Sequence, residues 1–247
     1  MTLCLLHAFP LNSGMWRAQQ QELASRCSVI TPDFPGFGAE PLVEGMEWTI
    51  PAMAQWVKRE LDRKGVKRAV IGGLSMGGYV AFECWRLFPE RIAGLILADT
   101  MAPSDTPVTR RGRFVAIGQL RNGGYQKFAA GMIPKMISET TKEQRPEVVK
   151  AVVRMYEEAA PQSVIAALGG LAHRNDSRPL LPTITVPTAV IVGEHDTITT
   201  VDDARLMAAM IPNAQLTIIP TAGHLANLEM RIEFNAALLH FLERVGE

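Results

Sequence analysis

The chain has no excess charge of either sign, since its 247 residues include 25 Lys and Arg and 25 Asp and Glu. Proteins that bind nucleic acid by displacing counterions from phosphates need a basic surface, so we expect no nucleic-acid partner. The tightest basic cluster, Arg110, Arg111 and Arg113, is interpreted as a solvated loop or helix start. No apolar run approaches the roughly 18 residues of a membrane span, so none is expected.

Cysteine is also scarce. Cys4, Cys27 and Cys84 cannot all pair within the chain, and no Cys-x-x-Cys motif is present. Free thiols are typical of a reducing compartment, and the N-terminal residues lack the pattern of a secretory signal, so we expect a cytoplasmic protein. The scattered histidines and the missing phosphate and dinucleotide motifs lead us to expect neither a metal nor a cofactor.

Apolar residues are abundant, at 47% of the chain, and many fall in short runs. Six runs have strand length and no polar alternation, which predicts buried parallel strands at 3–7, 28–31, 69–72, 92–98, 188–192 and 216–219. Helical periodicity lies between them, at 49–64, 76–88, 201–210 and 231–245. The alternation predicts an α/β fold with a mostly parallel sheet and helices on both faces.

The alternation is interrupted once, between residues 101 and 178, where only helical patterns occur. Prolines border this segment, as they often border structural units: Pro103 and Pro107 on one side, Pro179 and Pro182 on the other. We therefore predict a core of residues 1–100 and 179–247, with residues 101–178 inserted as a helical cap, or lid.

The strongest motif is Gly-x-Ser-x-Gly at 73–77, which follows an apolar run and precedes a helical pattern. In such a nucleophile elbow, a sharp turn holds the serine in a strained conformation. Gly73 and Gly77 remove the Cβ atoms that would collide there. The turn also places Ser75 at a helix N-terminus, which favours negative charge. The alternative is a glycine-rich turn that only packs a helix on a sheet.

A serine hydroxyl needs a base before it can act as a nucleophile, and the chain has five histidines. His224 follows the last apolar run and precedes the C-terminal helix, so we expect it at the same edge of the sheet as Ser75. We assign it as the base. The others are interpreted as structural or surface residues: His7, His173, His195 and His240.

The base needs a carboxylate that fixes its tautomer. Two aspartates follow apolar runs and could reach the same histidine, Asp196 after 188–192 and Asp99 after 92–98. The order Ser75, Asp196, His224 is the one expected of hydrolases with this elbow.

Acyl transfer also needs two N–H donors for the oxyanion. The residue after the nucleophile, Met76, is predicted to supply one, and the backbone N–H of Phe9, after the first strand, the other. Taken alone, residues 6–10 could equally be an ordinary turn.

These segments together resemble the α/β-hydrolase superfamily over essentially the whole chain, most closely its lid-bearing bacterial esterase and enol-lactonase branch. The matching segments are 6–10, 32–38, the elbow around Ser75, 193–196 and 223–224. The resemblance favours Asp196 over Asp99 as the acid and assigns Asp33 to shaping a turn. Ala8 stands where the family usually has glycine.

The family normally begins with a β-hairpin, whereas the first strand here starts at residue 2 or 3. We therefore expect six strands, all parallel, without that hairpin, and with the strand from Ser28 at one exposed edge.

The resemblance implies a serine hydrolase that cleaves small carboxylic esters through Ser75, His224 and Asp196 by way of an acyl-enzyme. The expected partner is a small-molecule ester or lactone held beneath the lid, where Phe9 and Met132 are predicted to bind it. Enol-lactone or C–C bond hydrolysis, cofactor-free perhydrolysis, and a lyase or synthase reaction would use the same triad. A ligand receptor with little turnover is the alternative from another class.

Overall fold

The computed structural model describes residues 1–246, in which a central sheet is formed by the predicted apolar runs. Its strands are β1 (Thr2–Leu6), β2 (Ser28–Ile30), β3 (Ala69–Leu74), β4 (Ile92–Ala98), β5 (Thr188–Gly193) and β6 (Ala214–Ile219). They pair in parallel in the order β2-β1-β3-β4-β5-β6. The prediction of six parallel strands with the strand from Ser28 at one edge is confirmed.

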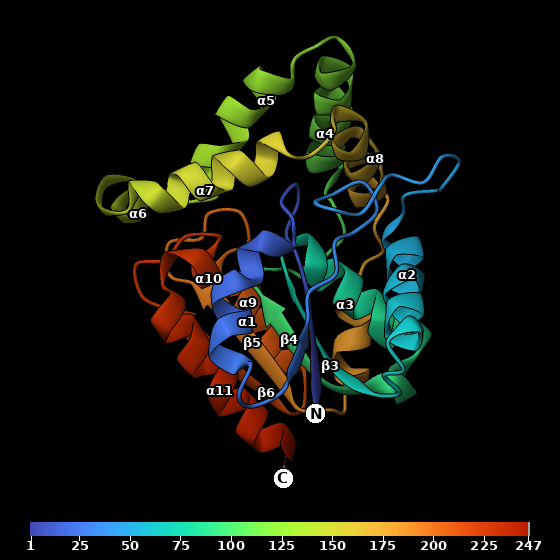
Figure 1. Cartoon of the computed structure of the whole chain (residues 1–247), viewed down its shortest axis with the longest axis vertical. Helices are drawn as coiled ribbons and strands as arrows, with labels where there is room; N and C mark the ends of the chain where they lie inside the picture. The colour runs from blue at the N-terminus through green and yellow to red at the C-terminus, as the bar shows by residue number, and fades with distance from the viewer. Residues whose placement is uncertain (247) are drawn as a thin grey trace.

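Helices cover both faces of the sheet, as Figure 1 shows. One face carries α2 (Ile50–Arg63), α3 (Met76–Leu87) and α9 (Val201–Met210), and the other carries α1 (Arg17–Leu23), α10 (Ala226–Glu229) and α11 (Arg231–Gly246). Every residue of β3 and β5 is buried, which explains why these runs show no polar alternation.

The chain between β4 and β5 contains five α-helices, which we call the inserted helices. They are α4 (Pro107–Arg121), α5 (Tyr125–Met132), α6 (Glu139–Gln144), α7 (Pro146–Glu157) and α8 (Pro161–Ala172). Three of them begin with proline, which suits the first helical position because its missing N–H has no partner there. In Figure 1 the inserted helices lie beyond the carboxyl ends of the strands.

Short 3₁₀ helices complete the chain: η1 (Ser13–Trp16), η2 (Pro89–Arg91), η3 (Ile133–Lys135) and η4 (Arg178–Thr183). The three cysteines are free and buried. Within residues 1–246, no helix has both the length and the apolar composition that crossing a membrane requires.

Hydrogen bonds fix the inserted helices to one another and to the core. The hydroxyl oxygen of Tyr125 lies 2.8 Å from the carbonyl oxygen of Tyr156 and 2.6 Å from that of Ala159, so its one hydrogen is shared between these two acceptors. The hydroxyl of Tyr156 donates to the carbonyl of Tyr125 at 3.0 Å. The side-chain amide of Asn12, in the loop after β1, donates to the carboxylate of Glu158 at 2.7 Å. These bonds set the position of α5 and α7 over the sheet.

Candidate active site

Ser75 lies on the turn between β3 and α3, with φ 55° and ψ −112°. A side chain at either flanking glycine would collide with backbone: a Cβ on Gly73 would lie 2.1 Å from the carbonyl of Gly77, and one on Gly77 would lie 2.2 Å from the carbonyl oxygen of Leu6. The glycine spacing is therefore a steric requirement of this turn, as the sequence pattern predicted.

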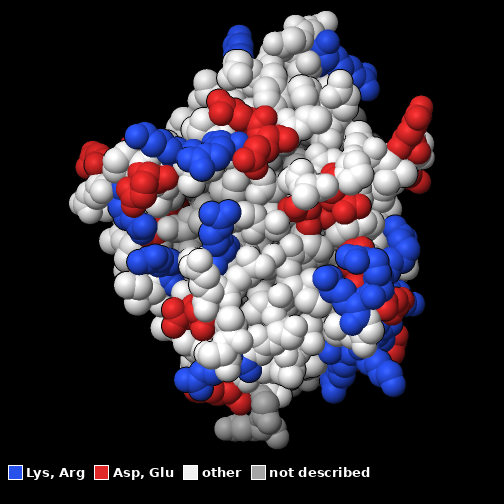
Figure 2. Space-filling model, in the orientation of Figure 1, with Lys and Arg blue, Asp and Glu red and all other residues white. Residues whose placement is uncertain are grey.

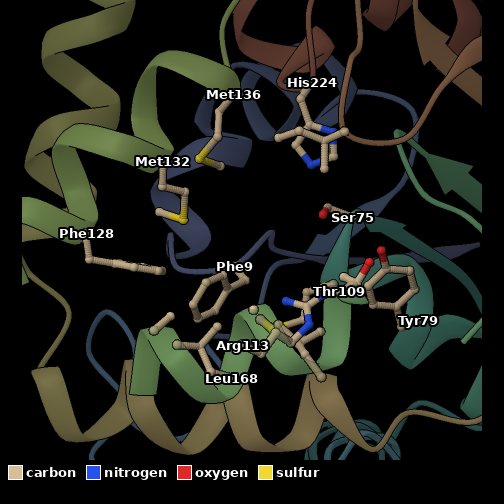
Figure 3. A pocket seen from close by; sticks show the side chains of 15 residues that line it. Phe9, Ser75, Tyr79, Thr109, Arg113, Phe128, Met132, Met136, Leu168 and His224 are labelled. Carbon is tan, nitrogen blue, oxygen red and sulfur yellow. The ribbon is translucent and has the colours of Figure 1, made fainter. Parts of the chain in front are cut away.

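His224 and Asp196 lie side by side at the same edge of the sheet, on the loops after β6 and β5. The Nδ1 of His224 is 2.8 Å from Oδ2 of Asp196, and both side chains are buried. An ionised carboxylate only accepts hydrogen bonds, so Nδ1 carries the hydrogen and Nε2 keeps a free lone pair. Figure 3 shows the imidazole of His224 and the hydroxyl of Ser75 pointing toward one another across one cavity.

Asp196 is held by its own loop as well as by the histidine. Its Oδ1 accepts the N–H groups of Ile198 and Thr199 at 2.8 and 3.1 Å, and its Oδ2 accepts the Thr199 hydroxyl at 2.6 Å. Burial tends to raise the pKa of Asp196, but the charge and hydrogen bond of His224 and the bonds from Thr199 outweigh it, so the pKa lies below its ordinary value. The carboxylate therefore stays ionised beside the imidazole.

Asp99, the alternative acid, has a different environment at the end of β4. It is fully buried, and its Oδ1 accepts the backbone N–H of Gly193 at 2.8 Å. Within the described residues its Oδ2 has no hydrogen-bond partner. Burial, with the nearby charge of Asp196, raises its pKa well above the ordinary value, which favours the neutral acid. Of the two aspartates, Asp196 is the one bonded to His224.

Met76 and Phe9, whose backbone N–H groups are the predicted donors for the oxyanion, lie on the same cavity as Ser75. Met76 begins α3, and Phe9 follows β1 beside a cis peptide bond to Pro10. Within residues 1–246 neither N–H donates a hydrogen bond to another protein group. Both residues line the cavity that contains Ser75. The cavity wall therefore contains two residues whose backbone N–H groups are unpaired, and an oxyanion needs unpaired donors of this kind.

Glu229 holds the loop that carries His224 and was missed by our sequence reasoning. Its buried carboxylate accepts the N–H groups on either side of the histidine, from Gly223 at 3.0 Å and from Leu225 at 3.2 Å. Its other oxygen accepts the N–H of Ser138, at the start of α6, at 2.8 Å. The only signal in the sequence was an acid in a mostly apolar stretch, five residues after the histidine.

The cavity has a volume of about 400 Å³ and lies between the serine and the inserted helices. The structure places both predicted substrate-binding residues, Phe9 and Met132, in its wall. Phe128, Met136 and Leu168 add further apolar surface, as Figure 3 shows. An apolar cavity with a few polar groups is typical of a small-molecule site.

One interpretation of the sequence is wrong in part. Arg110 and Arg111 are exposed, but Arg113 faces inward, lines the cavity and pairs with Asp105. The three arginines lie on α4, where the helical period places Arg113 on roughly the opposite side of the helix axis from Arg111. The wall also contains Thr109 and Tyr79, which our sequence reasoning did not identify.

The other histidines lie outside the cavity wall. The ring of His7 accepts the N–H of Phe34 at 3.0 Å and contacts the carbonyl of Ala8 at 2.9 Å, which supports the loop after β1. His173, His195 and His240 are exposed. Asp33 accepts the N–H groups of Ser13 and Ala39, so it shapes a turn. Within the described chain, no group of three or more His, Cys, Asp or Glu side chains is placed to hold a metal ion.

The fold is a parallel sheet covered by helices on both faces. Its site combines a serine on a strained turn, a hydrogen-bonded His–Asp pair and an apolar cavity. Together these features define a class of protein, the hydrolases with an α/β sheet. The family model described as the alpha/beta hydrolase fold matches residues 2–230. The chain belongs to this family.

Its relatives include enzymes of two named activities. An esterase from Thermogutta terrifontis, solved with malate bound, is 39% identical with a TM-score of 0.96, and the match covers 99% of this chain and 90% of that one. An enol-lactonase from Burkholderia xenovorans LB400 is 25% identical with a TM-score of 0.90, covering 98% and 91%. The 3-oxoadipate enol-lactonase 2 of Acinetobacter baylyi is 27% identical, covering 94% of this chain and 85% of its own length.

Proposed function

We propose that this protein is a serine esterase that cleaves small carboxylic esters through Ser75, His224 and Asp196. The observation that carries the proposal is the buried His224–Asp196 pair, bonded at 2.8 Å, on the cavity that the Ser75 hydroxyl faces. The pair leaves Nε2 as the basic nitrogen, and a serine hydroxyl needs such a base to react.

In the proposed reaction, Ser75 Oγ attacks the ester carbonyl carbon while Nε2 of His224 takes the hydroxyl proton. Asp196 stabilises the imidazolium. The N–H groups of Phe9 and Met76 hold the oxyanion, each worth about 3 kcal/mol of transition-state stabilisation. The C–O bond then breaks, the proton passes from the imidazolium to the leaving alcohol, and Ser75 is left acylated.

The second half of the reaction releases the acid. A water molecule gives its proton to Nε2 of His224 and attacks the acyl carbon, and the bond to Ser75 breaks as the serine regains a proton from the imidazolium. The inserted helices act as the lid in this proposal, since their apolar side chains form the wall opposite the serine. The cavity, at about 400 Å³, suits a small ester.

Lactone hydrolysis is the second candidate. It needs the same groups, because a lactone is a cyclic ester whose leaving alcohol remains attached to the acyl chain. The similarity to two enol-lactonases, at 25% and 27% identity, supports keeping it.

The test is hydrolysis of p-nitrophenyl esters from acetate to decanoate, and of a panel of lactones, by the wild type and Ser75→Ala. We expect a preference for short acyl chains and a loss of at least about a thousandfold in kcat for Ser75→Ala. Ser28→Ala, at the exposed start of β2, is the matched control. Full activity of Ser75→Ala on these esters would overturn the proposal.

A further inference from the structure

Arg113 is the one cationic side chain, apart from the titratable His224, among the described residues that line the cavity. None of those lining residues is Asp or Glu. Figure 3 shows its guanidinium on the α4 wall, between Phe9 and Thr109, facing the same open space as the Ser75 hydroxyl. A fixed cation in a mostly apolar cavity is costly to desolvate, so its presence there calls for an explanation.

The orientation of Arg113 is fixed from behind by Asp105. Its Nε donates to Asp105 Oδ2 at 2.5 Å and its Nη2 donates to Oδ1 at 3.1 Å. Within residues 1–246 its Nη1 has no hydrogen-bond acceptor on the protein, and this nitrogen is not fully buried. The guanidinium is thus held rigidly with one donor group free.

Asp105 does not neutralise the arginine, because a second arginine shares it. Arg174 is buried and donates to Asp105 through Nη1. Its Nη2 donates to the carbonyl of Pro103 at 3.0 Å, and its guanidinium carbon lies 4.4 Å from the centroid of the Tyr79 ring. Burial tends to raise the pKa of Asp105, but its bond with Arg113 and the charges of both arginines hold it below the ordinary value. The two arginines and one carboxylate therefore carry one net positive charge.

We propose that Arg113 forms an anion subsite in the cavity, which binds a carboxylate carried by the ester or lactone substrate away from the reacting carbonyl. This inference rests on the proposed function and names its substrate class. A single net charge matches a carboxylate, whereas a phosphate monoester would bring a second charge into an apolar cavity with nothing to balance it. Figure 2 shows acidic and basic side chains interspersed over the face in view.

The test compares substrates that differ only in charge. One arm uses the monomethyl esters of succinate, glutarate and adipate, each against a neutral isostere with an isopropyl group for the carboxylate. A second arm uses 4-acetoxybutanoate against its neutral isostere, so that a carboxylate on the leaving alcohol is distinguished from one on the acyl chain. We expect the wild type to prefer the anionic member of at least one pair in kcat/KM.

Arg113→Gln should lower that anionic-to-neutral ratio by on the order of 10- to 100-fold, the range of a charge-assisted hydrogen bond. Arg113→Lys keeps the charge and should retain part of the preference. Arg111→Gln removes the same charge from the exposed side of α4 and should leave the ratio unchanged. Equal loss on both members of a pair in Arg113→Gln, an equal effect of Arg111→Gln, or no anionic preference in the wild type would overturn the subsite.

A binding measurement separates this proposal from the proposed function. Ser75→Ala protein, titrated calorimetrically with monomethyl adipate and with its isostere, reports the subsite without turnover. We expect tighter binding of the anionic ester, and loss of that difference in the Ser75→Ala, Arg113→Gln double variant. Esterase activity without this difference would refute the subsite alone, and the difference without esterase activity would refute the catalytic assignment alone.

Discussion

Glu229→Gln tests whether a buried carboxylate joins the histidine loop to the inserted helices. The carboxylate accepts three backbone N–H groups, from Gly223, Leu225 and Ser138, and glutamine of the same shape has only one accepting oxygen. The less costly orientation keeps that oxygen on the pair flanking His224 and turns the amide –NH₂ toward the N–H of Ser138.

One buried N–H then loses its acceptor, which costs about 1–3 kcal/mol. For a chain of this size, about 2 kcal/mol corresponds to a fall in Tm of about 4–8 °C. Because the histidine loop also loses its tie to α6, we expect kcat on p-nitrophenyl acetate to fall roughly tenfold, with a smaller change in KM.

The assays are thermal unfolding followed by circular dichroism and steady-state kinetics. Glu233→Gln, on the exposed side of α11, removes the same charge without these bonds and serves as the control. Glu229→Gln with the Tm and kcat of the wild type would refute the reasoning.

Three further predictions follow from the same geometry. Burial lowers the pKa of His7 to about 4, below the ordinary value of about 6.5. Between these two pH values the imidazole is protonated in the unfolded chain but neutral in the folded one. The free energy of unfolding therefore decreases as the pH falls from about 6.5 to about 4. At pH 5 this effect lowers the free energy of unfolding by about 2 kcal/mol. Urea unfolding at pH 7 and pH 5 should therefore show a smaller loss of stability in His7→Gln than in the wild type, and an equal loss in both proteins would contradict the prediction. Gly77→Ala places a Cβ 2.2 Å from a backbone oxygen of β1, so we expect the variant to misfold or to lose activity. A soluble variant with the kcat of the wild type would show that the turn tolerates a side chain. Asp196→Asn should lower kcat by on the order of 10³- to 10⁴-fold, whereas Asp99→Asn, which mimics a neutral acid, should stay within about threefold of the wild type; the reverse ranking in a kinetic comparison would move the acid to Asp99.

The sequence was most informative where neighbouring residues alone determine the local structure. The run at 92–98 coincides with β4 (Ile92–Ala98), and the pattern at 201–210 coincides with α9 (Val201–Met210), because uninterrupted apolar runs and amphipathic periods are properties of neighbouring residues. The glycines around Ser75 were equally readable, since the steric conflict they remove lies within the turn and its contact with β1.

Features that depend on contacts between segments distant in the chain could not be predicted from the sequence. Asp99 and Asp196 both follow strands, and only the packing of β4 beside β5 shows that one is sealed beneath Gly193 while the other reaches His224. The role of Arg113 depends on the placement of α4 over the cavity, and that of Glu229 on an N–H from α6, 91 residues away. No local pattern encodes these contacts.

The central claim is that the Ser75 hydroxyl is activated by His224, and reaction with a fluorophosphonate tests it most directly. We expect one equivalent to add to the wild-type protein, with peptide mass spectrometry locating the adduct on Ser75, no labelling of Ser75→Ala, and labelling of His224→Ala slowed by at least about a hundredfold. Rapid labelling of Ser75 in folded His224→Ala, or an unlabelled wild type that still hydrolyses esters, would contradict the account.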